Sequence, residues 1–175
     1  MIARSARECL LYIHLHPCAC GAANPATSQG LFATEGGLVA RYAGTCAQCG
    51  RTSAFEFTLA PDTPPLDAYG VGDRPSEIIC PGQFAQHSDQ LASRWPGDPA
   101  EIPHAKRAAA REDLRWALRD LEEIAKFMRD GAVPEAAFTS EAGRALYQTQ
   151  PGRFRSARLG ARIEAYRRLV AALGT

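Results

Sequence analysis

The sequence has very little lysine and no long apolar run. Only two of its 20 basic residues are lysines, Lys106 and Lys126, a bias that reflects GC-rich coding rather than a function. No stretch reaches the roughly 18 apolar residues that a membrane-spanning helix needs. The apolar run from Cys9 to Leu15 is interrupted by His14, and no small-residue cleavage site follows it. We therefore expect a cytoplasmic protein without a signal peptide and without a membrane partner.

The chain also lacks a strong net charge. Its formal net charge is +1, which gives no overall electrostatic attraction to nucleic acid. Residues 61–105 are acidic and residues 106–175 are basic, so charged surfaces are expected to be local. The candidates for a partner-binding surface are three arginines spaced along one helix face and three acidic residues of the middle segment: Arg155, Arg158, Arg162, Asp67, Asp73 and Glu77. The competing interpretation of both groups is a solvated surface in which they partly neutralise each other.

Recognisable catalytic motifs are absent as well. There is no HExxH, and no His-x-Glu followed by PCxxC of the zinc deaminases. His87, Ser88 and Asp89 have the residue types of a hydrolase triad, but neighbours on a helix point in different directions. Cys9 and Cys80 are expected to be buried as small apolar residues. We expect no catalytic residues.

The pattern of apolar residues and chain breakers predicts an α+β fold. Residues 1–60 are predicted as a β-sheet lobe, with strands in ECLLYIHLH (8–16), GGLVARYAGTC (36–46) and RTSAFEFTLA (51–60). A connecting loop rich in proline and glycine is predicted over 61–80, followed by a helical lobe of three to four helices over 81–175. The predicted helices cover about 81–94, 103–130, 140–150 and 154–173, with Gly131 ending the second.

Four cysteines carry the strongest signal. Cys18-X-Cys20 and Cys46-X2-Cys49 form two short pairs, and each pair can point two thiolates at one ion from a single tight turn. Gly21 and Gly50 follow the pairs and permit the left-handed backbone that such turns need. Four thiolates favour tetrahedral Zn²⁺, and a site closed by four cysteines is structural rather than catalytic. The first pair is one residue shorter than usual, so His14 or His16 remains an alternative ligand to Cys18.

These motifs resemble a zinc ribbon over residues 7–59, with TCAQCGRTSAFEF matching the pattern of CxxCG followed by a strand. The order CxCG, CxxCG, PSEIICPGQF, VPEAAFTSEAGRALY and PGRFRSARLGARIEAYRRL resembles a family of uncharacterised small proteins of GC-rich bacteria such as actinobacteria and myxobacteria. Small proteins of this type are similar to immunity proteins of secreted polymorphic toxins. The first resemblance implies a structural zinc, and the second implies a protein partner, with a toxin as the concrete example.

Three classes of function follow. The first is a non-catalytic protein-binding module, with immunity to a toxin as its most concrete version. The second is a nucleic-acid-binding zinc ribbon with a regulatory role. It is less expected because the ribbon carries few basic residues and because Phe55 and Phe57 alternate with polar residues as core residues do. The third is an enzyme of unknown chemistry with a structural zinc.

Overall fold

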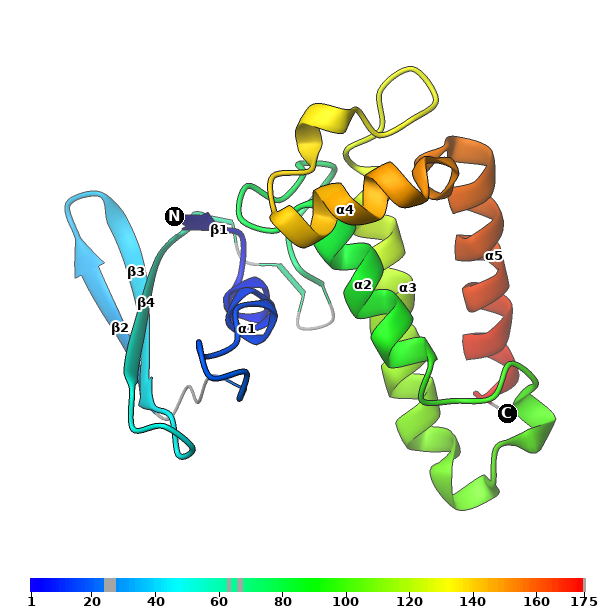
Figure 1. Ribbon diagram of the computed structural model, residues 1–175, viewed down its shortest axis with the longest axis horizontal. Coiled ribbons are helices and arrows are strands. Elements are labelled where there is room, and N and C mark those ends of the chain that lie inside the picture. Colours follow the sequence, from blue (N-terminus) through cyan, green and yellow to red (C-terminus); the bar gives the residue numbers. More distant parts are fainter. Residues whose placement is uncertain (24–27, 63, 66–67, 175) are drawn as a thin grey trace. The chain divides into compact units, whose positions relative to one another are not determined.

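A computed structural model describes residues 1–23, 28–62, 64–65 and 68–174, and its elements are labelled in Figure 1. The chain forms two compact units, Met1–Ile79 and Cys80–Thr175. The first holds a four-stranded sheet and the second is helical, which confirms the predicted α+β class. The predicted division at residues 60 and 80 stays a prediction.

The sheet of the N-terminal unit has the strand order β1-β4-β3-β2. β2 (Ser28–Thr34), β3 (Gly37–Thr45) and β4 (Thr52–Leu59) form an antiparallel meander. The short β1 (Ile2–Ala3) adds to the far side of β4 in parallel, with Ile2 opposite Thr58. β2 is therefore one edge of the sheet, and β1 is the other.

The core of this unit lies between one face of the sheet and helix α1 (Ala6–Leu15) (Figure 1). Side chains alternate between the two faces of a strand, so Ala40, Tyr42 and Phe57 share the covered face. Tyr12 of α1 packs edge-on against Phe55 and Phe57 at ring-centroid distances of 6.2 and 5.5 Å. The inward alternation predicted for these two phenylalanines is confirmed.

The prediction of a strand over 8–16 is wrong, because this segment is the helix α1. Ser5 caps the helix, with its Oγ accepting a hydrogen bond from the Glu8 backbone N–H at 3.0 Å. The buried Glu8 carboxylate accepts bonds from the Arg4 backbone N–H at 2.6 Å and from the Arg4 guanidinium. Ser-x-x-Glu is the signature of a capping box, and Cys9 and Ile13 lie on the buried helix face at a spacing of four residues.

The C-terminal unit contains four α-helices among its described residues. They are α2 (Pro81–Ala92), α3 (Arg107–Ala125), α4 (Glu141–Thr149) and α5 (Ser156–Ala172). Short 3₁₀ helices span Pro99–Glu101, His104–Lys106, Glu135–Ala137 and Pro151–Phe154. One core cluster joins Ile102, Leu114 and Leu173, and Phe138 and Phe154 pack edge-on at 4.7 Å. Four α-helices among the described residues lie within the predicted range of three to four.

The helix predicted over 103–130 extends too far at its C-terminal end. α3 ends at Ala125. The next three residues, Lys126, Phe127 and Met128, donate backbone hydrogen bonds to carbonyls three residues earlier, which is the tighter 3₁₀ pattern and not the α-helical one. Gly131 does not end this helix as predicted. Instead, Asp130 and Gly131 form a tight turn in which φ is positive at both residues, 48° at Asp130 and 82° at Gly131. Two backbone hydrogen bonds between Arg129 and Ala132 close this turn.

None of the helices that the structure describes combines the length and the apolar character needed to cross a membrane.

Candidate metal centre

Two turns of the N-terminal unit bring four cysteines together. Cys18 and Cys20 lie in the turn that follows α1, and Cys46 and Cys49 lie in the turn between β3 and β4. In each turn a glycine has a positive φ, 85° at Gly21 and 70° at Gly50. The N–H of Gly21 donates to the Cys18 carbonyl at 2.7 Å, and the N–H of Gly50 donates to the Cys46 carbonyl at 2.8 Å. A side chain at either glycine would strain this backbone, so the glycines shape both turns.

The four sulfur atoms form a cluster of the size that a metal ion requires. All four Sγ atoms lie within 4.8 Å of one another. The Sγ atoms of Cys18 and Cys49 are 3.5 Å apart, and those of Cys20 and Cys46 are 3.6 Å apart. Zn–S bonds of about 2.3 Å in a tetrahedron place the sulfurs about 3.8 Å apart, whereas a disulfide needs about 2.05 Å. The six cysteines are free thiols, so the cluster is arranged to hold a metal ion and not to form disulfides.

Electrostatics in this cluster also favour a cation. Backbone N–H groups of Cys49 and Gln48 stabilise the Cys46 thiolate and lower its pKa to about 7. The Arg51 N–H lowers the pKa of Cys49 too, but the crowded thiols of Cys18, Cys20 and Cys46, together with desolvation, outweigh it and raise that pKa to about 11. The Cys46 thiolate thus forms readily, whereas formation of the Cys49 thiolate is opposed. The positive charge of a bound divalent cation would stabilise several neighbouring thiolates at once and so remove this opposition.

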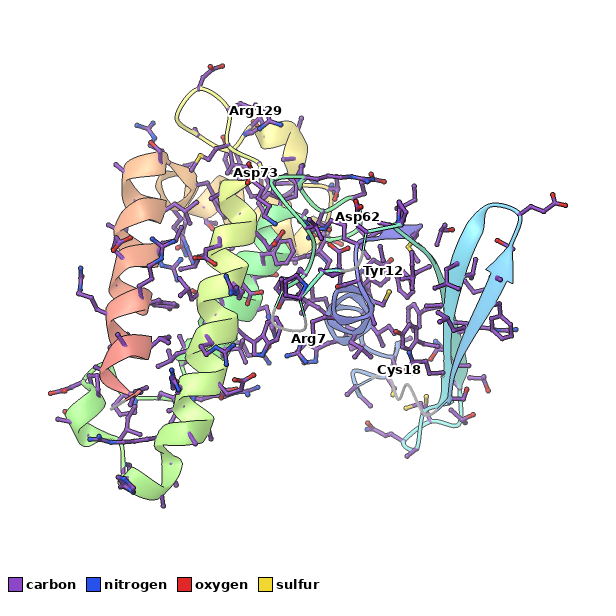
Figure 2. The ribbon with its side chains drawn as sticks, turned by 180° about the vertical axis from the view of Figure 1, so that it is seen from behind. Arg7, Tyr12, Cys18, Asp62, Asp73 and Arg129 are labelled. Atoms are coloured by element: carbon purple, nitrogen blue, oxygen red, sulfur yellow. The ribbon has the colours of Figure 1, made fainter. Side chains whose placement is uncertain are left out.

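The cluster lies partly inside the N-terminal unit and partly at its surface. Cys18 and Cys46 are buried, and Cys20 and Cys49 are exposed at its outer side. Figure 2 marks Cys18 near the sulfur atoms of this site. Neither histidine offered as an alternative belongs to the cluster of described residues. His16 stacks on Tyr12 at 3.9 Å, and its Nδ1 lies 2.7 Å from the Tyr12 carbonyl oxygen.

The three arginines predicted to share one face of the last helix have different surroundings in the structure. Arg155 precedes α5, and Arg155 and Arg158 are exposed. Arg162 instead forms an ion pair with Asp89 of α2 at 2.7 Å and lies 5.8 Å from the Tyr166 ring centroid. This pairing connects the basic C-terminal region with the acidic middle segment. The use of Arg155 and Arg158 as a binding surface stays a prediction.

Two of the three acidic candidates lie among the described residues, in the loop before α2. Asp73 is exposed in the loop before α2, and Glu77 forms an ion pair with Arg74 in which both side chains are about half exposed. Asp67 lies outside the described residues. A negative partner surface built from these residues stays a prediction.

Asp89 links several elements of the C-terminal unit, a role that its position in the acidic segment did not indicate. Its two carboxylate oxygens accept bonds from Arg153 Nη2 at 2.8 and 2.6 Å, and Oδ1 also accepts from Arg162 Nη2 at 2.7 Å. One carboxylate therefore ties α2 to the 3₁₀ helix Pro151–Phe154 and to α5. Both arginines are more than 60 residues away in the chain, so no local spacing could indicate the contact.

We expect Asp89→Asn to destabilise the C-terminal unit by about 1–2 kcal/mol, because it leaves two partly buried guanidinium groups side by side without their counter-charge. Urea unfolding followed by tryptophan fluorescence measures this, since Trp95 and Trp116 both lie in this unit. Glu164→Gln in α5 is the matched control in the same unit, and its exposed ion pair with Arg167 should contribute less than about 0.5 kcal/mol. Equal effects of the two substitutions would contradict the prediction.

His87, Ser88 and Asp89 point to three different partners, as expected for neighbours on a helix. His87 Nδ1 lies 2.7 Å from Oδ2 of the fully buried Asp120, and the Ser88 hydroxyl donates to the Ala117 carbonyl at 2.9 Å. These three residues do not form a triad. The His87–Asp120 pair joins α2 to α3, and no sequence motif predicted it.

The two remaining cysteines are buried, as predicted. Cys9 is fully buried beneath the sheet, and burial raises the pKa of its thiol to about 12. Cys80 precedes α2, and its Sγ lies 3.2 Å from Oγ of Ser140, the residue that caps α4. Neither thiol is exposed for reaction.

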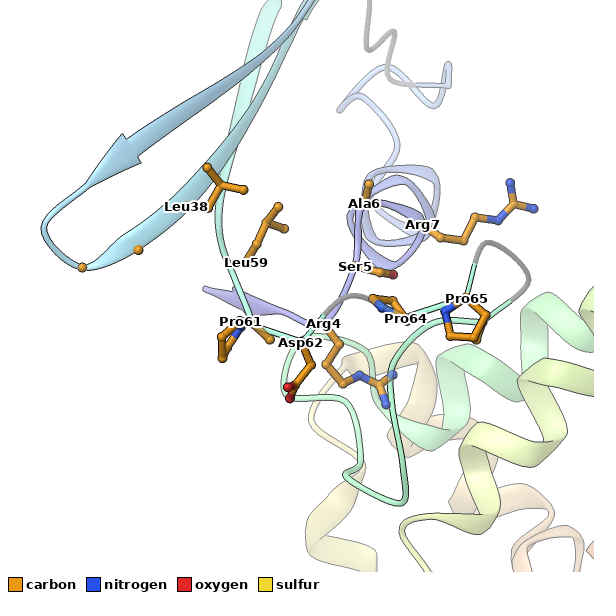
Figure 3. Close-up of a pocket in the computed structure, with 14 residues that line it drawn as sticks. Arg4, Ser5, Ala6, Arg7, Leu38, Leu59, Pro61, Asp62, Pro64 and Pro65 are labelled. Atoms are coloured by element: carbon orange, nitrogen blue, oxygen red, sulfur yellow. The ribbon is translucent and has the colours of Figure 1, made fainter.

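A pocket of about 690 Å³ opens in the N-terminal unit between the start of α1, the start of β3 and the segment after β4 (Figure 3). Its walls are mainly apolar, with Leu38, Leu59 and three prolines, Pro61, Pro64 and Pro65. Arg4, Arg7 and Asp62 supply charged groups. Sequence patterns did not indicate this pocket, because its walls come from three separated segments.

Comparison with known proteins adds no relative to these observations: no family, no curated protein and no solved structure gives a significant match to the chain.

Proposed function

We propose that the protein is a non-catalytic, cytoplasmic protein-binding module whose N-terminal unit is stabilised by a structural Zn²⁺. The observation that carries the proposal is the four-cysteine cluster, with all Sγ atoms within 4.8 Å of one another. Its most concrete version is an immunity protein that binds and neutralises a cognate bacterial toxin.

The choice of zinc rests on the donor set. Cys18, Cys20, Cys46 and Cys49 offer four soft thiolates at spacings close to those of a tetrahedron. Such a set selects zinc or iron–sulfur chemistry, and zinc is the common structural ion. Four protein ligands complete the coordination shell, so the ion would act by holding two turns together. Reduced cysteines at this site suit a cytoplasmic setting.

Protein binding is supported by the apolar pocket. A cavity with leucine and proline walls and a few charged groups can accept an apolar side chain of a partner. Nucleic-acid binding ranks second because Arg41 is paired with Glu56 at 3.4 Å and Phe57 is buried under α1. These residues would otherwise supply the charge and the stacking surface for a nucleic acid.

The metal part of the proposal is tested by elemental analysis of the protein purified without added metal. We expect one zinc per chain and no visible absorption from iron. An iron–sulfur spectrum, or a protein that folds with less than about 0.2 metal ions per chain, would overturn it.

The partner is tested by capture on the tagged protein from nuclease-treated lysate of the native host. The proposal predicts one stoichiometric protein, which a Leu38→Glu variant captures poorly because a charge is placed in the pocket wall. A Glu35→Lys variant, altered at an exposed position just before Gly36, is the control. Capture of nucleic acid that is released by salt, without a protein, would favour the second function instead.

A further inference from the structure

The outer strand of the sheet has features that natural edge strands usually avoid. β2 is seven residues long, lies at the end of the sheet, and its sequence SQGLFAT contains no ionisable residue and no proline. Exposed edges are normally protected by charge, proline or a bulge, because their unpaired N–H and C=O groups accept another strand. Leu31 and Phe32 are 56% and 52% exposed on this strand.

Both faces of the edge carry apolar surface. Leu31 pairs with Ala40 and therefore lies on the face that α1 covers farther along the sheet. Phe32 pairs with Val39 on the opposite face. Its ring lies over Gly30 so closely that a Cβ at that glycine would be 2.7 Å from ring atoms. An added strand would thus bury a leucine on one face and a phenylalanine on the other.

We propose that this edge pairs with the β2 edge of a second copy of the chain, in an antiparallel arrangement centred on Leu31. In this register Leu31 faces Leu31 of the partner subunit, and Phe32 faces Gly30 of the partner subunit. Because the Phe32 ring of each copy lies over its own Gly30, the two phenyl rings then pack against each other across the pairing. Every opposed pair from Ser28 to Thr34 is uncharged, so the self-pairing brings no like charges together.

The size of the edge sets the expected strength. A seven-residue strand is about 24 Å long and buries less than the roughly 800 Å² per partner of a standard interface. We therefore expect a reversible dimer with a dissociation constant on the order of 10 µM. The result is a continuous sheet through two subunits that leaves the metal centre and the apolar pocket outside the strand pairing.

Sedimentation velocity of the zinc-loaded full chain between about 1 and 200 µM tests the association. The wild-type protein should shift from monomer to dimer, and Phe32→Lys should remain monomeric over the whole range. Val71→Lys removes a similarly exposed apolar side chain, 49% exposed, from a loop and should still dimerise. A wild-type monomer at every concentration would overturn the proposal, as would a Phe32→Lys dimer of unchanged strength.

Cross-linking tests the register. Directly opposed residues in an antiparallel pair have Cα atoms about 4.5–5.5 Å apart, within disulfide range. Leu31→Cys should therefore form a disulfide-linked dimer under oxidised glutathione. Gln29→Cys lies on the same face two residues away, and its copies would be about 14 Å apart, so it should stay unlinked. Equal cross-linking of both variants would contradict the register, and zinc content of each variant reports whether its fold is intact.

Discussion

Zinc content should fall from one ion per chain to well below one when Cys46 is replaced by serine. Cys46 is a buried member of the cluster, and its sulfur lies 3.6 Å from that of Cys20. Structural zinc contributes on the order of 10 kcal/mol to small zinc-dependent domains, so losing one of four thiolates removes most of what stabilises this site. We expect residues 1–79 to become sensitive to limited proteolysis, which mass spectrometry of the fragments detects.

Cys80→Ser is the matched control for this experiment, since the same substitution is made outside the cluster. Cys80 is the N-cap residue of α2, where serine is among the preferred residues, so this variant should keep its zinc and its protease resistance. Removal of zinc from the wild-type protein with a chelator should reproduce the behaviour of Cys46→Ser. Unchanged metal content and proteolysis in Cys46→Ser would mean that the four thiols do not form the metal centre.

The second large effect is expected at a contact between two helices. Gly82 in the first turn of α2 meets Gly143 in the first turn of α4, and a Cβ on Gly82 would be 2.4 Å from the Gly143 Cα atom. Because that atom belongs to the backbone, a rotamer change cannot relieve the clash. We expect Gly82→Ala to destabilise the C-terminal unit by about 3 kcal/mol and to lower the midpoint of its thermal unfolding by more than about 10 °C.

Gly160 provides a control of opposite sign. It lies within α5, and an added Cβ would meet no atom within 4 Å. Alanine has a higher helix propensity than glycine, so Gly160→Ala should stabilise the unit by up to about 1 kcal/mol. Tryptophan fluorescence during thermal unfolding measures both variants. If Gly82→Ala raised the midpoint as Gly160→Ala should, helix propensity rather than the close contact would dominate at Gly82.

The metal centre was predictable from the sequence because its information is local. Each cysteine pair and its glycine define a turn within a few residues, and only the meeting of the two turns had to be inferred. The helix α1 was missed although Ser5 and Glu8 carry a capping-box signature, since the apolar run after Glu8 fits a strand or a helix equally well. The decisive contact, the burial of Glu8 against Arg4, is not visible in an apolar pattern.

The helical unit shows the complementary case. Helix positions followed from caps, prolines and apolar spacing, so α2, α4 and α5 lie close to their predicted ranges. Contacts between helices were not predictable, since Asp89 pairs with arginines far along the chain and Gly82 fits against Gly143. An acidic residue in a soluble segment and a glycine near a proline have the same local appearance whether or not a distant partner exists.

The position of β1 has a consequence for the order of folding. β2, β3 and β4 pair with their neighbours in sequence, so these hairpins close short loops and can form early. β1 instead pairs in parallel with β4, the last strand of the meander. This pairing brings Ile2 opposite Thr58 and therefore closes a long loop. A metal ion that links the turn after α1 to the β3–β4 turn shortens the search for this pairing, because it holds α1 near the sheet before β1 docks. Zinc would then act on the refolding rate as well as on the final stability.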